Sequence, residues 1–155
     1  MAAESILKDW EEWSTPQITS EMWITQIYES LANQGKASIA EPLTHTIMEK
    51  GVHAAIELYY KLKKTQPDAY NFDEYELNML GYQLLWRDMN EAAVEVHKLN
   101  TQAYPDSANP YDSLADAYEA SGELELAIEA YEKALERDPK MPSAIEGLKR
   151  LKTDK

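Results

Sequence analysis

The feature that most constrains the fold of this chain is the stretch from Asn109 to Pro139, which predicts two amphipathic helices joined by a glycine turn. The first helix is expected to begin at Asn109 and Pro110, because Asn is a favoured N-cap and Pro is tolerated in the first helical turn. Gly122 is expected to end this helix, since Gly adopts the left-handed conformation that often follows a helix. The second helix is expected from about Leu124 until Pro139 interrupts it.

The two predicted helices carry small residues where they would cross and tyrosines that would fill the remaining space. Together they resemble one tetratricopeptide repeat (TPR), a helical hairpin of about 34 residues. A generic helical hairpin rarely has the small residues and the closing Pro in register, so the resemblance is specific. The matching positions are Tyr111, Leu114, Ala115, Tyr118, Ala127, Tyr131, Ala134 and Pro139, with Gly122 at the turn.

The same pattern recurs upstream at a regular spacing. Ala93 precedes Ala127 by one repeat length, and Pro105 precedes Pro139 by the same interval. This spacing indicates a second repeat, and a slightly longer interval from Ala55 to Ala93 indicates a degenerate first repeat. We therefore predict an all-α, right-handed α-solenoid with a TPR domain at 38–152, repeats at about 38–73, 74–107 and 108–141, and a capping helix at 143–152.

Residues 1–36 carry no TPR signature and predict a two-helix N-terminal extension, with helices over about 5–13 and 20–33. Three of the four tryptophans of the chain lie in this segment. They either pack the two helices against the first repeat or form an exposed partner surface, such as a homodimer interface. The segment is alternatively an occupant of the protein's own groove, or is foreign to the repeat domain. The three tryptophans are Trp10, Trp13 and Trp23.

Local sequence features predict hydrogen bonds of two kinds, at a helix start and for a buried amide. The pair Ser38 and Glu41 fits a capping box at the start of the first repeat. His97 and Asn100 depart from the TPR pattern, which has an aromatic residue and Ala at these positions. An unpaired buried amide costs about 1–3 kcal/mol, so Asn100 is expected to bond the backbone of the turn that follows it.

The charge of the chain restricts its partners. Its 28 acidic and 15 basic residues give a net charge of −13, which repels phosphate and argues against nucleic-acid binding and docking on anionic membranes. This charge favours basic partners, or serves solubility alone. No apolar run approaches the roughly 18 residues of a membrane span, and no signal peptide is recognisable. The default expectation is a cytoplasmic protein, or an exported one if the chain is a piece of a larger protein.

Few residues suggest catalysis or metal binding. The chain has no Cys, which removes thiolate nucleophiles and Cys-ligated metals. His45 and His53 are eight residues apart with Gly51 between them, so they do not share the i, i+4 face that favours a metal pair. His97 is expected in a packed position. The prediction is a non-enzymatic protein with no catalytic residues, no cofactor and no metal.

The TPR resemblance implies a concave groove lined by the first helix of each hairpin. One TPR subfamily grips a peptide's terminal carboxylate with Lys, Arg and Asn; here only Asn78 matches, while Asp112 and Asp116 would repel a carboxylate. A peptide with an aromatic or apolar anchor and a nearby Lys or Arg fits better. The predicted groove residues are Tyr75, Asn78, Tyr82, Trp86, Asn109, Asp112, Ser113, Asp116 and Glu119.

An alternative is that these tyrosines merely cover the inner face, while Asp112 complements the positive end of its own helix. If the groove prediction holds, changing both Asp112 and Asp116 to Lys should remove binding of a basic partner and leave the melting temperature nearly unchanged.

Residues 38–141 also resemble a module at the C-terminal end of some bacterial serine hydrolases of the β-lactamase/esterase type. The resemblance lies in LNMLGYQLL, LNTQAYPDSAN and YDSLADAYEASGELELAIEAYEKAL. No catalytic domain comes with these segments, and the chain has no G-x-S-x-G motif. The resemblance implies an accessory domain that packs on a catalytic partner, as an alternative to a peptide-binding scaffold. A stand-alone enzyme with an unrecognised site is a third hypothesis.

Overall fold

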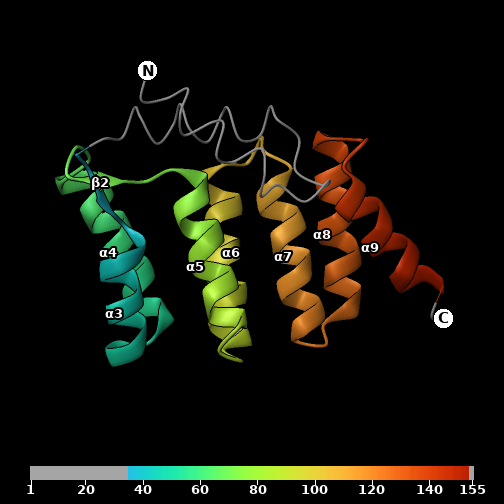
Figure 1. Ribbon diagram of the computed structural model, residues 1–155, viewed down its shortest axis with the longest axis horizontal. Helices are drawn as coiled ribbons and strands as arrows, with labels where there is room; N and C mark the ends of the chain where they lie inside the picture. The colour runs from blue at the N-terminus through green and yellow to red at the C-terminus, as the bar shows by residue number, and fades with distance from the viewer. Residues whose placement is uncertain (1–34, 154–155) are drawn as a thin grey trace, which may run out of the picture. The chain divides into compact units, whose positions relative to one another are not determined.

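The computed structural model describes residues 35–153, which form a row of helices with one short pair of strands (Figure 1). The two helices expected within residues 1–36 lie outside the described residues. The elements are β1 (Ala37–Ser38), α3 (Ala40–Lys50), α4 (Val52–Thr65), β2 (Tyr70–Asn71), α5 (Glu74–Leu85), α6 (Asn90–Ala103), α7 (Asn109–Ala120), α8 (Leu124–Arg137) and α9 (Pro142–Thr153).

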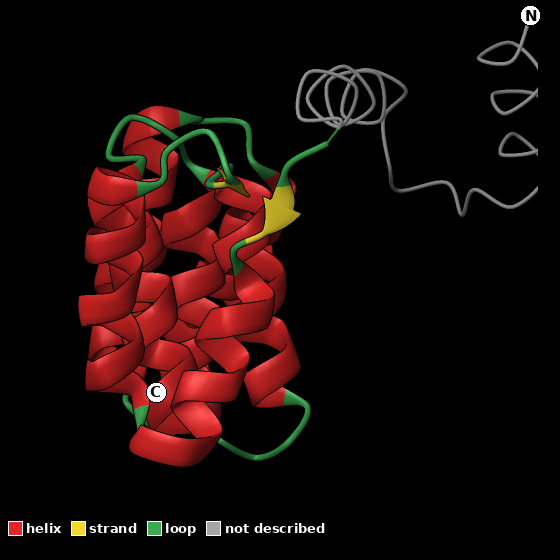
Figure 2. Ribbon diagram, turned by 90° about the vertical axis from the view of Figure 1, so that its left-hand side faces the viewer, coloured by secondary structure: helices red, strands yellow, loops and turns green. Residues whose placement is uncertain are grey.

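Helices that follow one another in the chain pack side by side, from α3 against α4 through to α8 against α9. A second set of contacts joins α3 to α5, α5 to α7, and α4 to α6. The odd-numbered helices therefore form one layer and the even-numbered helices the other. Figure 2 shows the helices from the end of the row. This arrangement is an all-α solenoid, and it confirms the predicted fold class.

Small residues allow neighbouring helices to approach closely, as the sequence pattern predicts. A Cβ atom added to Gly81 of α5 would lie 2.2 Å from Nε2 of His97 in α6. A Cβ atom on Gly147 of α9 would lie 2.4 Å from the Tyr131 ring of α8. The remaining crossing positions are alanines that are fully buried: Ala93, Ala115, Ala127 and Ala134.

Two clusters of buried residues form the core. The first joins α3 to α6 and includes Leu43, Tyr59 and Leu80. The second joins α6 to α9 and includes Leu114 and Tyr131. Since each cluster connects successive helices, burial continues along the row instead of converging on one centre.

The chain that enters α3 is held by a parallel strand pair that the sequence analysis did not anticipate. Ala37 pairs with Tyr70, and Ser38 pairs with Asn71. Because Ser38 lies in β1, its hydroxyl donates to the Glu76 carboxylate and accepts the Ala40 N–H at 3.2 Å. Ile39, not Ser38, is the N-cap of α3. The predicted capping box was wrong because Ser38 is not the N-cap, and its hydroxyl bonds both Glu76 of α5 and the first N–H of α3.

The predicted partner of Asn100 and the predicted N-cap role of Asn109 were also wrong. Both side chains bond Glu74 at the start of α5. Nδ2 of Asn100 donates to the Glu74 carbonyl at 3.1 Å, not to the turn after its own helix. Nδ2 of Asn109 donates to Oε1 of Glu74 at 2.8 Å, and the N-cap of α7 is Ala108. Stacking of the hairpins brings the first turn of α5 beside the end of α6 and the start of α7.

Candidate peptide-binding surface

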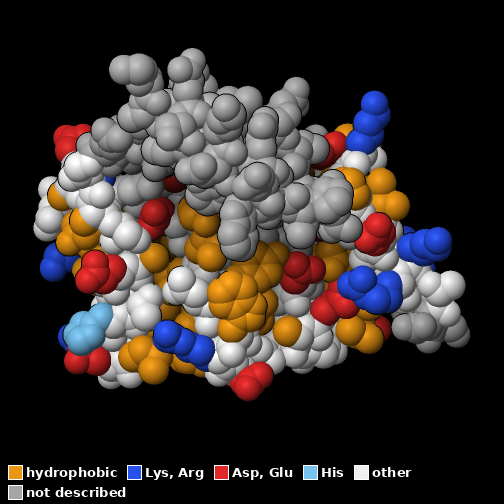
Figure 3. Space-filling view, viewed as in Figure 1, with side chains coloured by type: hydrophobic (Ala, Val, Ile, Leu, Met, Phe, Trp, Pro, Cys, Tyr) orange, Lys and Arg blue, Asp and Glu red, His pale blue; other side chains and the backbone are white. Residues whose placement is uncertain are grey.

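An aromatic stripe lies along α5, formed by Tyr75 and Tyr82 within the helix and by Trp86, its C-cap residue. These residues are seven and four positions apart, which places them on one face of the helix. The side chains of Tyr75 and Trp86 are 48% and 72% exposed, while Tyr82 is half-buried. Figure 3 shows hydrophobic side chains near the middle of this face and charged side chains toward α9. Their spacing along one face makes this stripe of aromatic residues a candidate binding surface.

Asp116 of α7 accepts hydrogen bonds from two tyrosines. The Tyr82 hydroxyl donates to Oδ2 at 2.8 Å, and the Tyr131 hydroxyl donates to Oδ1 at 2.7 Å. The pKa values of both tyrosines are raised, first by burial and then by the neighbouring carboxylates, so both stay neutral donors. Asp116 therefore links α5, α7 and α8.

Glu119, one helical turn further along α7, bonds a cation that the sequence analysis did not include in the groove. Nη2 of Arg150 lies 2.6 Å from Oε1 of Glu119, and the Tyr131 hydroxyl oxygen lies 2.6 Å from the same atom, so its single proton is shared between Glu119 and Asp116. Arg150 lies in α9, one repeat length after Asp116. That repeat spacing was the signal that could have assigned Arg150 to this face.

Asp112 and Ser113 lie inside the contact between α7 and its neighbours. Asp112 is only 6% exposed, and Ser113 is 1% exposed. The Ser143 hydroxyl of α9 donates to Oδ2 of Asp112 at 2.7 Å. Burial raises the pKa of Asp112 to about 6, and the Asp116 charge adds to this rise. A lysine at position 112 would place its stem and charge in this contact, so we now expect the double substitution to lower the melting temperature.

The two predicted asparagines differ in their hydrogen bonding. Asn109 bonds Glu74 and is half-buried at the start of α7. Oδ1 of Asn78 is buried and has no hydrogen-bond partner among the described residues. Of the predicted groove residues, the structure brings together Tyr82, Ser113 and Asp116, and leaves Tyr75 and Trp86 exposed along α5.

The histidines occupy the kinds of position expected for structural residues. His97 is fully buried, and burial lowers its pKa to about 4. His45 pairs with Glu49 at 3.3 Å on the surface of α3. Within residues 35–153 no group of three His, Asp or Glu side chains is placed to hold a metal ion. In the same range, no helix is long and apolar enough to cross a membrane.

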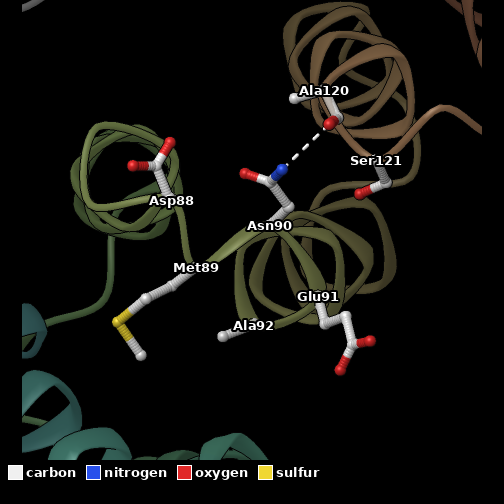
Figure 4. Close-up of a pocket in the computed structure, with 7 residues that line it drawn as sticks. All are labelled: Asp88, Met89, Asn90, Glu91, Ala92, Ala120 and Ser121. Carbon is white, nitrogen blue, oxygen red and sulfur yellow. Dashed lines mark hydrogen bonds between the residues drawn. The ribbon is translucent and has the colours of Figure 1, made fainter.

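An open depression of about 510 Å³ lies elsewhere, between the turn that joins α5 to α6 and the end of α7 (Figure 4). Nδ2 of Asn90 donates to the Ala120 carbonyl at 2.8 Å across this depression. Its lining contains none of the predicted groove residues. The lining residues are Asp88, Met89, Asn90, Glu91, Ala92, Ala120 and Ser121.

Comparison with known proteins agrees with this arrangement of helices. Residues 113–141 match the tetratricopeptide repeat family. The TPR domain of Sgt2 from Aspergillus fumigatus is 20% identical, with a TM-score of 0.52 over 75% of this chain and 76% of that chain. The first TPR domain of Spaghetti (RPAP3), bound to the HSP90 peptide SRMEEVD, is 18% identical, with a TM-score of 0.52 over 77% and 96%. The TPR domain of P58(IPK) is 18% identical, with a TM-score of 0.50 over 84% and 35%.

The described part of the chain therefore has the all-α solenoid fold of these TPR domains, and the segment that matches the tetratricopeptide repeat family lies in its third hairpin and the turn that follows. No curated protein matches the chain. The resemblance to a module of bacterial serine hydrolases stays a prediction.

Proposed function

We propose that this protein is a non-catalytic scaffold that binds a peptide segment of another protein on the face formed by α5, α7 and α9. The single observation that carries this proposal is the exposed aromatic stripe of α5, with Trp86 72% exposed, beside the carboxylates of Asp116 and Glu119. A large exposed indole at the end of a helix is a candidate for a binding hot spot.

The similar TPR domain of Spaghetti supports a peptide as the type of ligand, because that domain holds a peptide in its solved structure. Its peptide, SRMEEVD, contains three acidic residues. We propose the opposite charge preference for this protein, because its face carries carboxylates and the chain has a net charge of −13. Tyr75 and Trp86 would stack on an apolar or aromatic anchor, and a neighbouring Lys or Arg would meet Glu119.

A peptide-display selection on the immobilised full chain tests this proposal. From a random library of dodecapeptides, we expect enrichment of sequences that combine an aromatic or aliphatic anchor with Lys or Arg. The affinity of an enriched peptide, measured by fluorescence anisotropy, should fall at least about tenfold in Trp86→Ala. Leu124→Ala is the matched control, because Leu124 is also an exposed apolar residue but lies at the start of α8.

Two results would contradict the proposal. One is enrichment of acidic peptides, which would reverse the charge preference. The other is a peptide whose affinity is the same for the wild type and Trp86→Ala, which would place its binding site elsewhere. Equal losses in Trp86→Ala and Leu124→Ala would point to a general loss of structure, and thermal unfolding of both variants checks for this.

A further inference from the structure

Arg150 is the only charged partner of Glu119 among the described residues, and the two donors on Glu119 differ in how firmly they are held. The first donor is Tyr131, which is buried between α8 and α9, with its ring against Gly147. The second is the Arg150 guanidinium, whose side chain is 55% exposed. Only Arg150 could leave Glu119 without disturbing the core.

Asp116 does not offer the same opportunity to a ligand. Both of its hydrogen bonds come from tyrosine hydroxyls, and the rings of Tyr82 and Tyr131 are packed between helices. Asp112 is buried against Ser143. Of the three predicted carboxylates, Glu119 is therefore the one whose present cation can be exchanged for another.

We infer that Arg150 is a built-in competitor: its guanidinium occupies the position on Glu119 that a Lys or Arg of the bound peptide would take. This inference rests on the proposed function and assigns its charge selectivity to one residue pair. The Arg150 side chain is 55% exposed and the Glu119 side chain 21%, and ion pairs near the surface contribute little to stability. A ligand cation can therefore replace Arg150 without rearrangement of the helices. Because a ligand must displace Arg150, its cation alone contributes little net affinity. Ligands that also place an aromatic or apolar side chain against α5 are therefore favoured.

The experiment compares Arg150→Gln with Lys152→Gln. Lys152 is the matched control, because it also lies in α9, is also 55% exposed and is also paired with a glutamate, Glu132 of α8, at 3.0 Å. Both variants lose one positive charge, so any general attraction of a basic peptide rises equally. The probes are the enriched basic peptide from the display selection and its counterpart with norleucine in place of Lys or Arg.

We expect Arg150→Gln to bind the basic peptide about fivefold more tightly than the wild type does. Lys152→Gln should stay within about twofold of the wild type, and Arg150→Gln should leave the affinity of the norleucine peptide unchanged. In a Glu119→Gln background, Arg150→Gln should have no further effect. Should Arg150→Gln lose cooperative unfolding, Arg150→Met, which keeps the aliphatic stem, replaces it.

The failures of the two proposals are distinguishable. If the basic peptide binds but Arg150→Gln binds it no more tightly than Lys152→Gln does, the inference about Arg150 is overturned and the peptide-binding function stands. If no peptide binds any variant, both are overturned. An equal gain for the basic and norleucine peptides would also overturn the inference, since relief of competition requires the ligand's cation.

Discussion

The imidazole of His97 is fully buried in surroundings that disfavour its charged form. Its ring lies edge-on to Tyr82 at 5.3 Å between centroids and directly against Gly81. Neither ring nitrogen has a hydrogen-bond partner among the described residues. Buried polar groups without partners cost free energy, and an aromatic residue without nitrogen is the usual TPR choice at this position.

Replacement of His97 by Phe should raise the melting temperature, and more so at pH 5 than at pH 7.5. The pKa of His97 is lowered from 6.5 to about 4 in the folded protein. As the pH falls between these values, the unfolded chain takes up a proton that the folded chain rejects, so stability is lost over this window. Phe removes this loss. Thermal unfolding at both pH values measures it, and an equal gain at both would contradict the burial of a neutral imidazole.

At the scale of elements, the turns that join the helices of a hairpin are equivalent but differ in their chemistry. Gly122 lies between α7 and α8 with a φ of 76°. Asp88, one repeat length earlier, lies between α5 and α6 with a φ of 58°. The left-handed conformation is unfavourable for a residue with a Cβ atom and easy for Gly.

Asp88→Gly should therefore stabilise the protein by about 0.5–1 kcal/mol, because relief of the left-handed conformation outweighs the added freedom of the unfolded chain. Urea-induced unfolding measures the change. Asp106→Gly is the control: Asp106 is also exposed and lies in the turn between α6 and α7, but without a positive φ. Equal effects of the two substitutions would mean that the conformation of Asp88 is not the cause.

The crossing of α7 and α8 depends on a small residue at position 127. Ala127 is fully buried in the second core cluster. Ala127→Leu should lower the free energy of unfolding by about 1–3 kcal/mol, because the added atoms would push the two helices apart. Ala120→Leu is the control, since Ala120 is exposed at the end of α7. A neutral effect at position 127 in chemical unfolding would be inconsistent with the observed register of the repeat.

At the scale of the whole molecule, charge should decide between ligands of similar shape. The peptide SRMEEVD, which the similar domain of Spaghetti binds, should not bind this protein measurably. Its acidic side chains would meet a chain with a net charge of −13 and the carboxylates of Asp116 and Glu119.

A variant peptide in which both Glu and the Asp are replaced by Lys is the control for length and register. It should bind more tightly than SRMEEVD, with a difference that shrinks as salt rises. Isothermal titration at two salt concentrations tests this expectation. Tighter binding of SRMEEVD would reject the proposed charge preference and point to Arg150 as an anion-binding residue.

Much of the hairpin architecture could be predicted, because helical periodicity and the repeat spacing both report local conformation. The small residues at the crossings, such as Ala127, and the left-handed Gly122 follow from this pattern. The hydrogen-bond partners could not be predicted in the same way. Ser38, Asn100 and Asn109 each bond α5 through a contact between residues that are distant in the sequence.

The sequence by itself determined that this chain forms stacked helical hairpins, since each hairpin buries the face that its own periodicity defines. Only the tertiary structure decided which groove residues are available to a ligand. Asp112 bonds Ser143 and Glu119 pairs with Arg150, because the fold places these two residues of α9 against α7. The physical reason is that an apolar pattern specifies which face is buried, whereas contacts between polar side chains depend on how successive helices stack.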